Sequence, residues 1–355
     1  MSKIRVAVLG ATGTIGQRFV SLLQDHPTFE LAALCSSERK VGGRLGDFWR
    51  LDGVPLDAEV GRMDLQPVDV KGMAHEDIVA VFSGLPSEVA GELETDAARA
   101  GVRVFSNASS HRMEDGVPLL VPEVNADHMA LVERQATFQD GGFLATNPNC
   151  SVTGLVLALK PLADAFDLRD VHVATYQALS GAGYPGVPSL DIEGNVLPFI
   201  ENEEDKMRRE AKKILGARSA TAIVESPIEV WANCVRVAVR DGHLEAVSIP
   251  LSEDLRAEEV AKVLSSFRGE PQRRKLPTAP IQPVIVREER DRPQPLRDVL
   301  AGEPERARGM AAVVGRIRVV ERILRFFVLS HNTIRGGAGG SVLNAELAHA
   351  EGYLG

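Results

Sequence analysis

The sequence predicts an α/β protein with a Rossmann-type dinucleotide-binding domain followed by a second, mixed α/β domain that contains an antiparallel sheet. Short apolar runs alternate with amphipathic stretches over the first 150 residues, a glycine-rich turn follows the first run, and longer alternating segments follow residue 150. A single core rarely grows past ~250 to 300 residues, and this chain has 355. We expect one domain at 1–149, completed by a C-terminal helix at 337–355, and another at 150–336.

The composition is that of a globular protein, with 44% hydrophobic and 25% charged residues. The 40 Lys and Arg against 49 Asp and Glu give a net charge of −9 with both signs interspersed, which argues against nucleic acid as a partner. Three cysteines without a CxxC pair suggest neither a disulfide framework nor a zinc site, and they fit a reducing cytoplasm. No apolar run approaches the ~18 residues of a membrane span, and no signal peptide is recognisable. We expect a soluble cytoplasmic protein that needs no metal.

The first half contains the pattern of a parallel sheet. Its buried strands are expected at residues 4–9, 29–35, 79–82, 102–106 and 143–146. Between the first two, apolar residues from Ile15 to Leu23 have helical spacing and Pro27 follows them, which completes a βαβ unit.

The second half begins with a helix whose apolar residues run from Val152 to Leu159, and we expect Pro161 to bend or end it. Alternating strands are expected at residues 171–179, 233–240, 243–249, 311–320 and 323–330, with a short one at 283–287. The dipeptide Asp241-Gly242 predicts a β-hairpin. Its register would pair Val239 with Leu244 and Val237 with Ala246. The same register would place four side chains on one face: Arg236, Ala238, Arg240 and His243.

The glycine-rich turn reads Gly10-Ala-Thr-Gly13-Thr-Ile-Gly16, between the first strand and the first helix. Such glycines permit a tight turn, the approach of a pyrophosphate to backbone N–H groups, and close helix packing. The alternative is a turn with no ligand, but the complete strand-turn-helix-strand context favours a dinucleotide. The cofactor contacts expected here are Gly10, Thr12, Gly13, Thr14, Ile15 and Gly16.

The end of the second strand favours NADP over NAD. Ser37, Arg39 and Lys40 stand where an NAD site would carry an acidic residue for the ribose, and two cations suit a 2′-phosphate. Glu38 favours NAD instead, because it could accept a hydrogen bond from a ribose hydroxyl. The alternative for Arg39 and Lys40 is a solvated turn that binds no ligand. Further cofactor contacts are expected after the third strand, at Gly84, Leu85 and Pro86.

Cys150 lies between a buried strand and a helix, where a helix N-terminus lowers the pKa of a thiol. Alternatively, a cysteine can be a small, buried hydrophobic residue, and we assign that role to Cys35 and Cys234.

Several sequence blocks, in the same order as in a known family, carry a resemblance: GATGTIGQ, SNASSHRM at 106–113, PLLVPEVN at 118–125, NPNCS around Cys150, YQALSGAG at 176–183, GNVLPFIENEEDKM at 194–207, the 236–243 segment and SHNTIRGGAGGSVLNAEL at 330–347. The chain resembles the aspartate-β-semialdehyde dehydrogenases typical of archaea, fungi and some bacteria. It departs from that branch at Ala238 and Lys40.

The resemblance implies roles for residues of the site. Cys150 would attack an acyl phosphate to form a thioester, His243 would be the acid/base group, and backbone N–H groups at the helix start after Cys150 would stabilise the oxyanion. The substrate would be held by Gln177, Arg236 and Glu203, with Glu201 and Glu204 as alternatives to Glu203. Phosphate would be bound by Asn107, Arg112, Asn149 and Lys206. The cofactor would also contact Ser180, Gly181, Gly183, Asn332 and Thr333.

The implied activity is the NADPH-dependent reductive dephosphorylation of L-aspartyl 4-phosphate to L-aspartate 4-semialdehyde, in lysine, threonine and methionine biosynthesis, by a homodimer or homotetramer. A malonyl-CoA reductase of the same family is the nearest alternative, since it shares the covalent mechanism. A non-catalytic NADP-binding sensor is the alternative from another class, and it would need neither Cys150 nor His243.

Overall fold

The computed structural model describes residues 3–219 and 222–355. The chain forms two compact units. The first comprises Met1–Leu120, Asp127–Asn147 and Gly337–Gly355, and the second comprises Val121–Ala126 and Pro148–Gly336.

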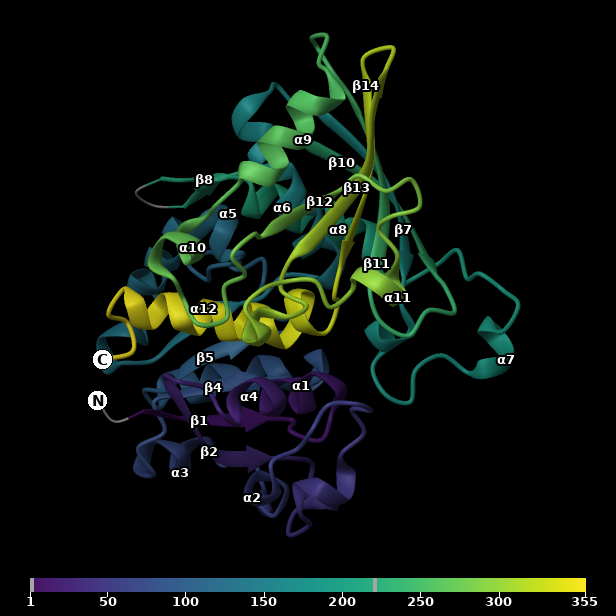
Figure 1. Cartoon of the computed structure of the whole chain (residues 1–355). Helices are drawn as coiled ribbons and strands as arrows, with labels where there is room; N and C mark the ends of the chain where they lie inside the picture. The colour runs from purple at the N-terminus through teal and green to yellow at the C-terminus, as the bar shows by residue number, and fades with distance from the viewer. Residues whose placement is uncertain (1–2, 220–221) are drawn as a thin grey trace. The chain divides into compact units, whose positions relative to one another are not determined.

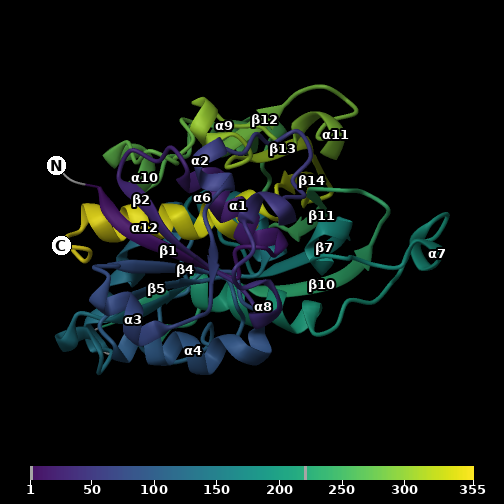
Figure 2. The same ribbon diagram turned by 90° about the horizontal axis from the view of Figure 1, so that it is seen from below.

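The first unit is a Rossmann-type α/β fold. Its elements are β1 (Ile4–Leu9), α1 (Thr14–Leu23), β2 (Phe29–Cys35), α2 (Ala58–Gly61), β3 (Leu65–Gln66), α3 (Val70–His75), β4 (Ala80–Ser83), α4 (Ser87–Arg99), β5 (Arg103–Ser106), β6 (Phe143–Thr146) and α12 (Gly339–Ala350). The strands pair in parallel in the order β3-β2-β1-β4-β5-β6, so the topological switch lies between β1 and β4. Figure 2 shows α3 and α4 on one face of this sheet and α1 and α12 on the other. The predicted strands are confirmed, and β3 was not predicted.

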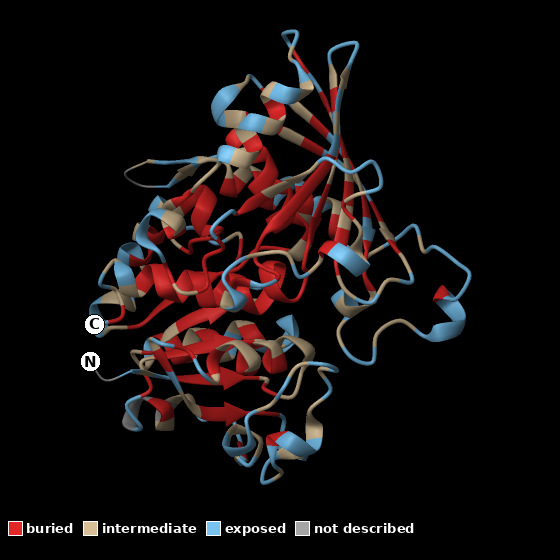
Figure 3. Ribbon diagram, in the orientation of Figure 1, coloured by how far each residue is buried: buried red, intermediate tan, exposed pale blue. Residues whose placement is uncertain are grey.

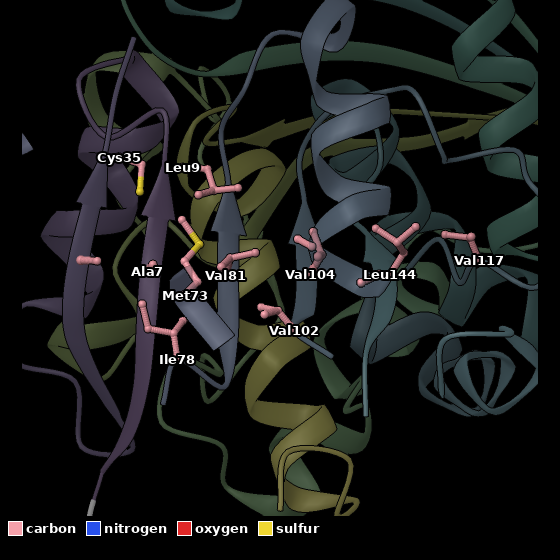
Figure 4. Close-up of a cluster of buried hydrophobic side chains, with 13 residues drawn as sticks. Ala7, Leu9, Cys35, Met73, Ile78, Val81, Val102, Val104, Val117 and Leu144 are labelled. Carbon is pink, nitrogen blue, oxygen red and sulfur yellow. The ribbon is translucent and has the colours of Figure 1, made fainter. Parts of the chain in front are cut away.

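Both faces of the parallel sheet are packed with apolar side chains. One face carries an aliphatic cluster that includes Leu9, Val81, Val104 and Leu144, drawn in Figure 4. The neighbouring positions point to the other face and carry a row of rings: Phe29, Phe82, Phe105 and Phe143 are joined by centroid distances of 5.8 to 5.9 Å. The last helix α12, yellow in Figure 1, packs against α1 and β5. Because both faces of the sheet are buried, the strands are continuous apolar runs in the sequence.

The glycines after β1 and β4 are required by close backbone approach. A Cβ on Gly16 would lie 2.0 Å from the Gly10 carbonyl oxygen, and one on Gly10 would lie 2.9 Å from the Gly84 carbonyl oxygen. Gly10 also has a φ of +76°. The turn therefore brings the carboxyl ends of β1 and β4 together at the switch point, where open α/β sheets bind their ligands.

The second unit is built on a mixed sheet. Its elements are α5 (Pro122–Asn125), α6 (Cys150–Ala165), β7 (Asp170–Gln177), α7 (Ser189–Ile192), α8 (Glu203–Ile214), β8 (Ala217–Arg218), β9 (Ile223–Val224), β10 (Glu229–Arg236), β11 (His243–Pro250), α9 (Ala257–Ser266), α10 (Glu270–Arg274), β12 (Val284–Arg287), α11 (Pro295–Asp298), β13 (Ala312–Val320) and β14 (Ile323–Ser330). The strand order is β10-β7-β11-β14-β13-β12. The pairs β7-β11, β11-β14 and β13-β14 are antiparallel, whereas β10-β7 and β12-β13 are parallel.

The hairpin predicted at Asp241-Gly242 is wrong. β10 and β11 do not pair; β7 lies between them. The backbone carbonyls of Val239 and Arg240 accept hydrogen bonds from the N–H groups of Leu179 and Ser180, in the loop after β7. Because those groups are used, the segment after β10 crosses the end of β7 instead of turning back on itself.

We expected Pro161 to bend or end its helix; it does not end it, because α6 continues to Ala165. A proline inside a helix costs ~3 kcal/mol or more. The fully buried Leu155, Leu159 and Leu162 supply apolar contacts that outweigh that cost. Figure 3 shows how α6 and the strands carry the buried residues, while the loop around α7 is exposed. Within residues 3–219 and 222–355, no helix has both the length and the apolar character to cross a membrane.

Glu245 is a buried carboxyl in the middle of β11. Its side chain is on the inner face with His243 and Val247, and neither carboxyl oxygen finds a hydrogen-bond partner among the described residues. Burial, and next the charge of Glu203, raises the pKa of this carboxyl well above its ordinary range. Folding therefore favours the neutral, protonated form of Glu245.

Replacing this acid with its neutral amide should change the pH dependence of stability. A carboxyl whose pKa is raised by folding contributes stability below its unfolded pKa of ~4.3 and loses it as pH rises, by up to ~1.4 kcal/mol per pH unit. Glu245→Gln should therefore lose less stability than wild type between pH 5 and 8. Thermal unfolding across that range measures the difference, with Glu253→Gln, an exposed carboxyl, as control. Parallel curves for Glu245→Gln and wild type would contradict the assignment.

Candidate active site

Asn149 caps helix α6 and so determines where Cys150 stands. Its side-chain Oδ1 accepts hydrogen bonds from the N–H groups of Ser151 at 2.9 Å and Val152 at 3.3 Å, and its carbonyl accepts from Thr153 at 3.1 Å. Cys150 is therefore the first residue of the helix. The N–H groups of Ser151 and Val152, which are among the expected oxyanion donors, donate to the capping side chain in this structure.

Cys150 differs from the other two thiols in exposure. It is half-buried, whereas Cys35 and Cys234 are buried in strands. Burial raises the pKa of each of these two thiols to about 12, so neither forms a thiolate at neutral pH. This is consistent with the expected inert roles of Cys35 and Cys234.

His243 lies directly beside the Cys150 sulfur. It is the first residue of β11, and its Nε2 is 3.1 Å from Sγ. Its Nδ1 accepts a hydrogen bond from the backbone N–H of Ala178 at 3.0 Å. The ring is fully buried, and burial, followed by the charges of Arg236 and His331, lowers the pKa of His243 to about 3. The imidazole is neutral over the physiological pH range.

Arg236 reaches the same place from the end of β10. It pairs with Gln177 across the β10-β7 ladder, and its Nη1 donates to the Ala178 carbonyl at 2.7 Å. The hairpin prediction put Arg236 and His243 on one face for the wrong reason; the structure brings them together through Ala178. A Cβ on Gly181 would lie 2.9 Å from Arg236 Nη1 and 3.2 Å from His243 Nε2, so a larger residue there would displace these side chains.

Helix α8 presents two buried carboxylates to the turn before Cys150. Glu203 Oε1 accepts from Asn149 Nδ2 and from Gln177 Nε2, both at 2.9 Å. Glu210, two turns later, accepts from the Asn149 backbone N–H at 2.6 Å. Sequence reasoning missed Glu210. Its spacing of seven residues from Glu203 was the available signal, but this charged helix has other acids and the spacing alone does not select one.

The other acids of this segment lie elsewhere. Glu201 is exposed, and Glu204 accepts a hydrogen bond from the Cys234 backbone N–H at 3.1 Å. Glu203 is thus the acid that the fold places beside Asn149 and Gln177. Lys206 follows Glu203 by three residues on α8 and is half-buried.

Several residues expected to contact the cofactor hold the loops around His243. Asn332 Oδ1 accepts from the Gly242 N–H, and its Nδ2 donates to Ser180 Oγ, both at 2.8 Å. The N–H of Thr333 donates to His331 Nδ1 at 3.3 Å, and Gly183 has a φ of +71°. These contacts connect the segments after β7 and β14 to the turn that precedes His243.

The segment after β14 also reaches Cys150, which sequence reasoning did not anticipate in detail. A Cβ on Gly336 would lie 2.7 Å from the Cys150 Cα, so a larger residue would displace Cys150. The neighbouring Arg335 is fully buried and donates two hydrogen bonds to Glu123 in α5, at 2.7 and 3.1 Å. This ion pair anchors Gly336 against Cys150.

In the first unit, Lys40 reaches back to the glycine-rich turn. Its Nζ donates to Thr12 Oγ1 at 2.9 Å, so one of the predicted cations stands beside the turn after β1. Ser37 and Arg39 are exposed, in and before the 3₁₀ turn Glu38–Lys40. The arrangement leaves their side chains accessible to an anion.

Arg112 and Asn107 also belong to the first unit. Arg112 is largely buried, and its Nη2 donates to the Asn107 carbonyl at 2.7 Å. The Asn107 side chain donates to Ser341 Oγ at 3.0 Å and accepts from Asn147 Nδ2 at 3.2 Å. Asn107 thus orients Arg112 through its backbone, while its amide connects to α12. Over the described chain, no cluster of three or more His, Cys, Asp or Glu side chains is arranged to hold a metal ion.

Comparison with known proteins identifies the family. Residues 5–132 match the family described as semialdehyde dehydrogenase, NAD binding domain, and residues 159–335 match semialdehyde dehydrogenase, dimerisation domain. The aspartate-semialdehyde dehydrogenase of Archaeoglobus fulgidus is 48% identical over 348 residues, covering 96% of this chain and 97% of that protein.

Two further relatives bear on substrate and cofactor. The malonyl CoA reductase (NADP) of Metallosphaera sedula is 39% identical over 356 residues, covering 99% of this chain and 98% of that protein. The crystal structure of Candida albicans aspartate-semialdehyde dehydrogenase with NADP superimposes with a TM-score of 0.88 at 38% identity, covering 99% of this chain and all of that one. The resemblance and the fold class predicted from the sequence are confirmed, and the protein is an oxidoreductase of the semialdehyde dehydrogenase family.

Proposed function

We propose that this protein is an NADP-dependent aspartate-semialdehyde dehydrogenase that converts L-aspartyl 4-phosphate to L-aspartate 4-semialdehyde and phosphate. The observation that carries the proposal is the half-buried Cys150, 3.1 Å from His243 Nε2, with Arg236 and Glu203 joined to the same network. The aldehyde is a precursor in lysine, threonine and methionine biosynthesis.

The chemistry proceeds through Cys150. Its thiolate attacks the C4 carbonyl, a sulfur–carbon bond forms, and the carbon–oxygen bond to phosphate breaks. NADPH supplies the hydride that reduces the resulting thioester. The carbon–sulfur bond then breaks, which releases the aldehyde and restores the thiolate. His243 is the acid/base group for the substrate oxygen and the Cys150 sulfur in these steps.

The amino-acid end of the substrate carries a carboxylate and an ammonium group. We assign the carboxylate to Arg236, whose guanidinium can grip it in a bidentate fork, and the ammonium to Glu203. Gln177 and Asn149 both donate to Glu203, so they orient this carboxylate as well as facing the substrate. We propose four ligands for the phosphate: Lys206 and Asn149 in the second unit, and Arg112 and Asn107 in the first.

The first unit is proposed to bind NADP at the switch point between β1 and β4. Gly10 and Gly16 allow the backbone of the turn to pack closely, and Gly13 directly precedes the N-terminus of α1, where backbone N–H groups can bind a pyrophosphate. Gly84 begins the segment after β4. The family match over residues 5–132 supports a nicotinamide dinucleotide. Lys40 beside Thr12, with Ser37 and Arg39 accessible, favours the 2′-phosphate form.

A malonyl-CoA reductase is the second candidate, because one relative carries that name. The malonyl group has a carboxylate that Arg236 could bind, but it has no ammonium group. The buried Glu203 carboxylate, held by two amide donors, therefore favours the amino-acid substrate.

We also propose that the protein works in the cytoplasm as a homodimer or homotetramer assembled through the second unit. The aromatic side chains of Tyr176 and Trp231 are 40% and 48% exposed on the outer face of the β7-β10 ladder. The family description of residues 159–335 as a dimerisation domain supports this assembly.

The cofactor assignment predicts a preference of tenfold or more for NADPH over NADH. Charge-assisted hydrogen bonds to a 2′-phosphate contribute ~1.5 to 3 kcal/mol each, and Arg39→Ala or Lys40→Ala should shrink the ratio of kcat/KM values. Arg5→Ala, a surface cation at the opposite end of β1, is the control. Equal kcat/KM for the two cofactors in the wild-type enzyme would rule out the assignment.

Covalent catalysis predicts that Cys150→Ala abolishes turnover and stoichiometric alkylation by iodoacetamide at neutral pH. Cys35→Ala and Cys234→Ala should leave both nearly unchanged, since burial keeps those thiols protonated. Steady-state rates and mass spectrometry of the alkylated protein measure the two effects. More than a trace of activity in Cys150→Ala would exclude the thioester route.

The substrate assignment predicts that semialdehyde and NADP⁺ form NADPH only when phosphate or arsenate is supplied. Arg236→Lys should cut kcat/KM severely, because a point charge cannot reproduce the fork, and Arg112→Ala should raise the KM for phosphate more than that for the aldehyde. Glu203→Gln should weaken the use of aspartyl substrates. If CoA replaces phosphate with a higher rate, or malonyl-CoA is reduced faster than aspartyl phosphate, the second candidate is correct.

A further inference from the structure

Helix α4 contacts the turn at residues 106–112, which carries two of the proposed phosphate ligands, Asn107 and Arg112. We propose that Glu94, a buried acid on α4, is a positioning residue that holds this turn so that the Arg112 guanidinium is presented to a phosphate group. The proposal rests on the proposed function, because it takes Arg112 to be a phosphate ligand. All of these residues belong to the first unit.

One face of α4 carries the residues that contact the turn. Ser87, Gly91 and Glu94 follow one another at intervals of four and three residues, which places them in a row along the helix. At the start of that row, Ser87 Oγ accepts a hydrogen bond from the Ser109 N–H at 3.2 Å. The Ser87 carbonyl accepts another from Ser110 Oγ at 3.0 Å. The helix therefore supports the middle of the turn through its first residue.

Glu94, at the other end of the row, holds the start of the turn. Its Oε1 accepts a hydrogen bond from Ser106 Oγ at 2.8 Å, and the same hydroxyl oxygen accepts from the Ala108 N–H at 3.0 Å. The Ala108 N–H and the Asn107 carbonyl belong to one planar peptide group, so fixing one fixes the other. This carbonyl accepts from Arg112 Nη2 at 2.7 Å. Glu94 thus determines the orientation of the peptide group that holds the guanidinium.

The same carboxyl group also faces the end of the turn. Glu94 Oε2 lies 3.8 Å from His111 Nε2, which is 3.1 Å from the Gly91 carbonyl oxygen. The other ring nitrogen, Nδ1, lies 2.8 Å from Glu114 Oε1. Burial raises the pKa of the Glu94 carboxyl, while hydrogen bonding and then the charges of His111 and Arg112 act in the opposite direction. The acid therefore faces two adjacent basic residues of the turn.

The surroundings of Glu94 do not favour an acid on grounds of stability. The residue is fully buried, and its Oε2 has no hydrogen-bond partner in the described part of the chain. Burying such a group is unfavourable, and a well-packed apolar side chain in place of a buried ionic one is often neutral or stabilising. The connection to the peptide group between Asn107 and Ala108 gives the acid a role that an apolar side chain cannot fill.

The kinetic test uses the oxidative direction, with L-aspartate 4-semialdehyde, NADP⁺ and inorganic phosphate as substrates. Glu94→Leu removes both the acceptor for Ser106 and the group that faces His111. We expect this variant to raise the KM for phosphate about tenfold, with kcat and the other two KM values within about twofold of wild type, because only a phosphate ligand moves. Glu94→Gln keeps an oxygen that can accept from Ser106, so its effect should be smaller. Glu92→Gln, exposed on the same helix, is the control.

Two outcomes of these measurements would overturn the inference. One is an unchanged KM for phosphate in Glu94→Leu. The other is a rise of similar size in all three KM values, which a general disturbance of the fold would produce.

A double-mutant cycle tests whether Glu94 acts through Arg112. If it does, Glu94→Leu should change the KM for phosphate by less than about twofold when it is added to Arg112→Ala. Equal factors in the wild-type and Arg112→Ala backgrounds would contradict the positioning role. An effect of Arg112→Ala without an effect of Glu94→Leu would overturn this inference alone. An unchanged KM for phosphate in Arg112→Ala would instead refute the phosphate site of the proposed function, and the positioning role with it.

Ser106→Ala keeps the proposal testable if Glu94→Leu folds poorly. This substitution removes only the hydroxyl group that connects Glu94 to the peptide group before Ala108. We expect the same selective rise in the KM for phosphate, with an unchanged melting temperature as the check on folding. Ser21→Ala is the matched control, because its hydroxyl donates to the Arg18 carbonyl within α1. A KM for phosphate in Ser106→Ala equal to that of the control would overturn the inference.

Discussion

The backbone of Ala178 is the interaction on which the site depends. Its N–H orients His243 and its carbonyl holds Arg236, so a single residue at the end of β7 sets the distance between the imidazole beside the Cys150 sulfur and the Arg236 guanidinium. Neither contact uses a side chain of Ala178. The sheet order makes this possible, because β7 lies between β10 and β11 and its carboxyl end meets both of their functional residues.

Buried acids support the same region from the opposite side. Glu203 and Glu210 hold Asn149, which caps α6 and thereby positions Cys150. These carboxylates are hydrogen-bonded, as buried charges must be. Glu245, two residues from His243, lacks such partners among the described side chains, and burial raises the pKa of its carboxyl, which favours the protonated form.

The hairpin at Asp241-Gly242 shows where local reasoning failed. Alternating strands on either side of an Asp-Gly pair fit a hairpin, and its register placed Arg236 and His243 on one face. The pairing is wrong, because the carbonyls of Val239 and Arg240 bond to a loop that is 60 residues earlier in the chain. The two side chains are nevertheless neighbours, through a strand that the local pattern does not include. Turn chemistry describes a few adjacent residues and carries no information about which distant strand competes for their hydrogen bonds.

The sequence by itself determined the parallel strands of the first unit, the glycine turn and a helix directly after Cys150, because these depend on hydrophobic period and on glycines that are adjacent in the chain. The tertiary structure decided the order of the mixed sheet, the selection of Glu203 and Glu210 among many acids, and the orientation of the His243 ring. Each of these depends on a partner at long range: Asn149 lies 61 residues from Glu210, and Ala178 lies 65 from His243. Periodicity indicates which face of an element is buried, but the groups that meet it across the core are defined only when the chain has folded.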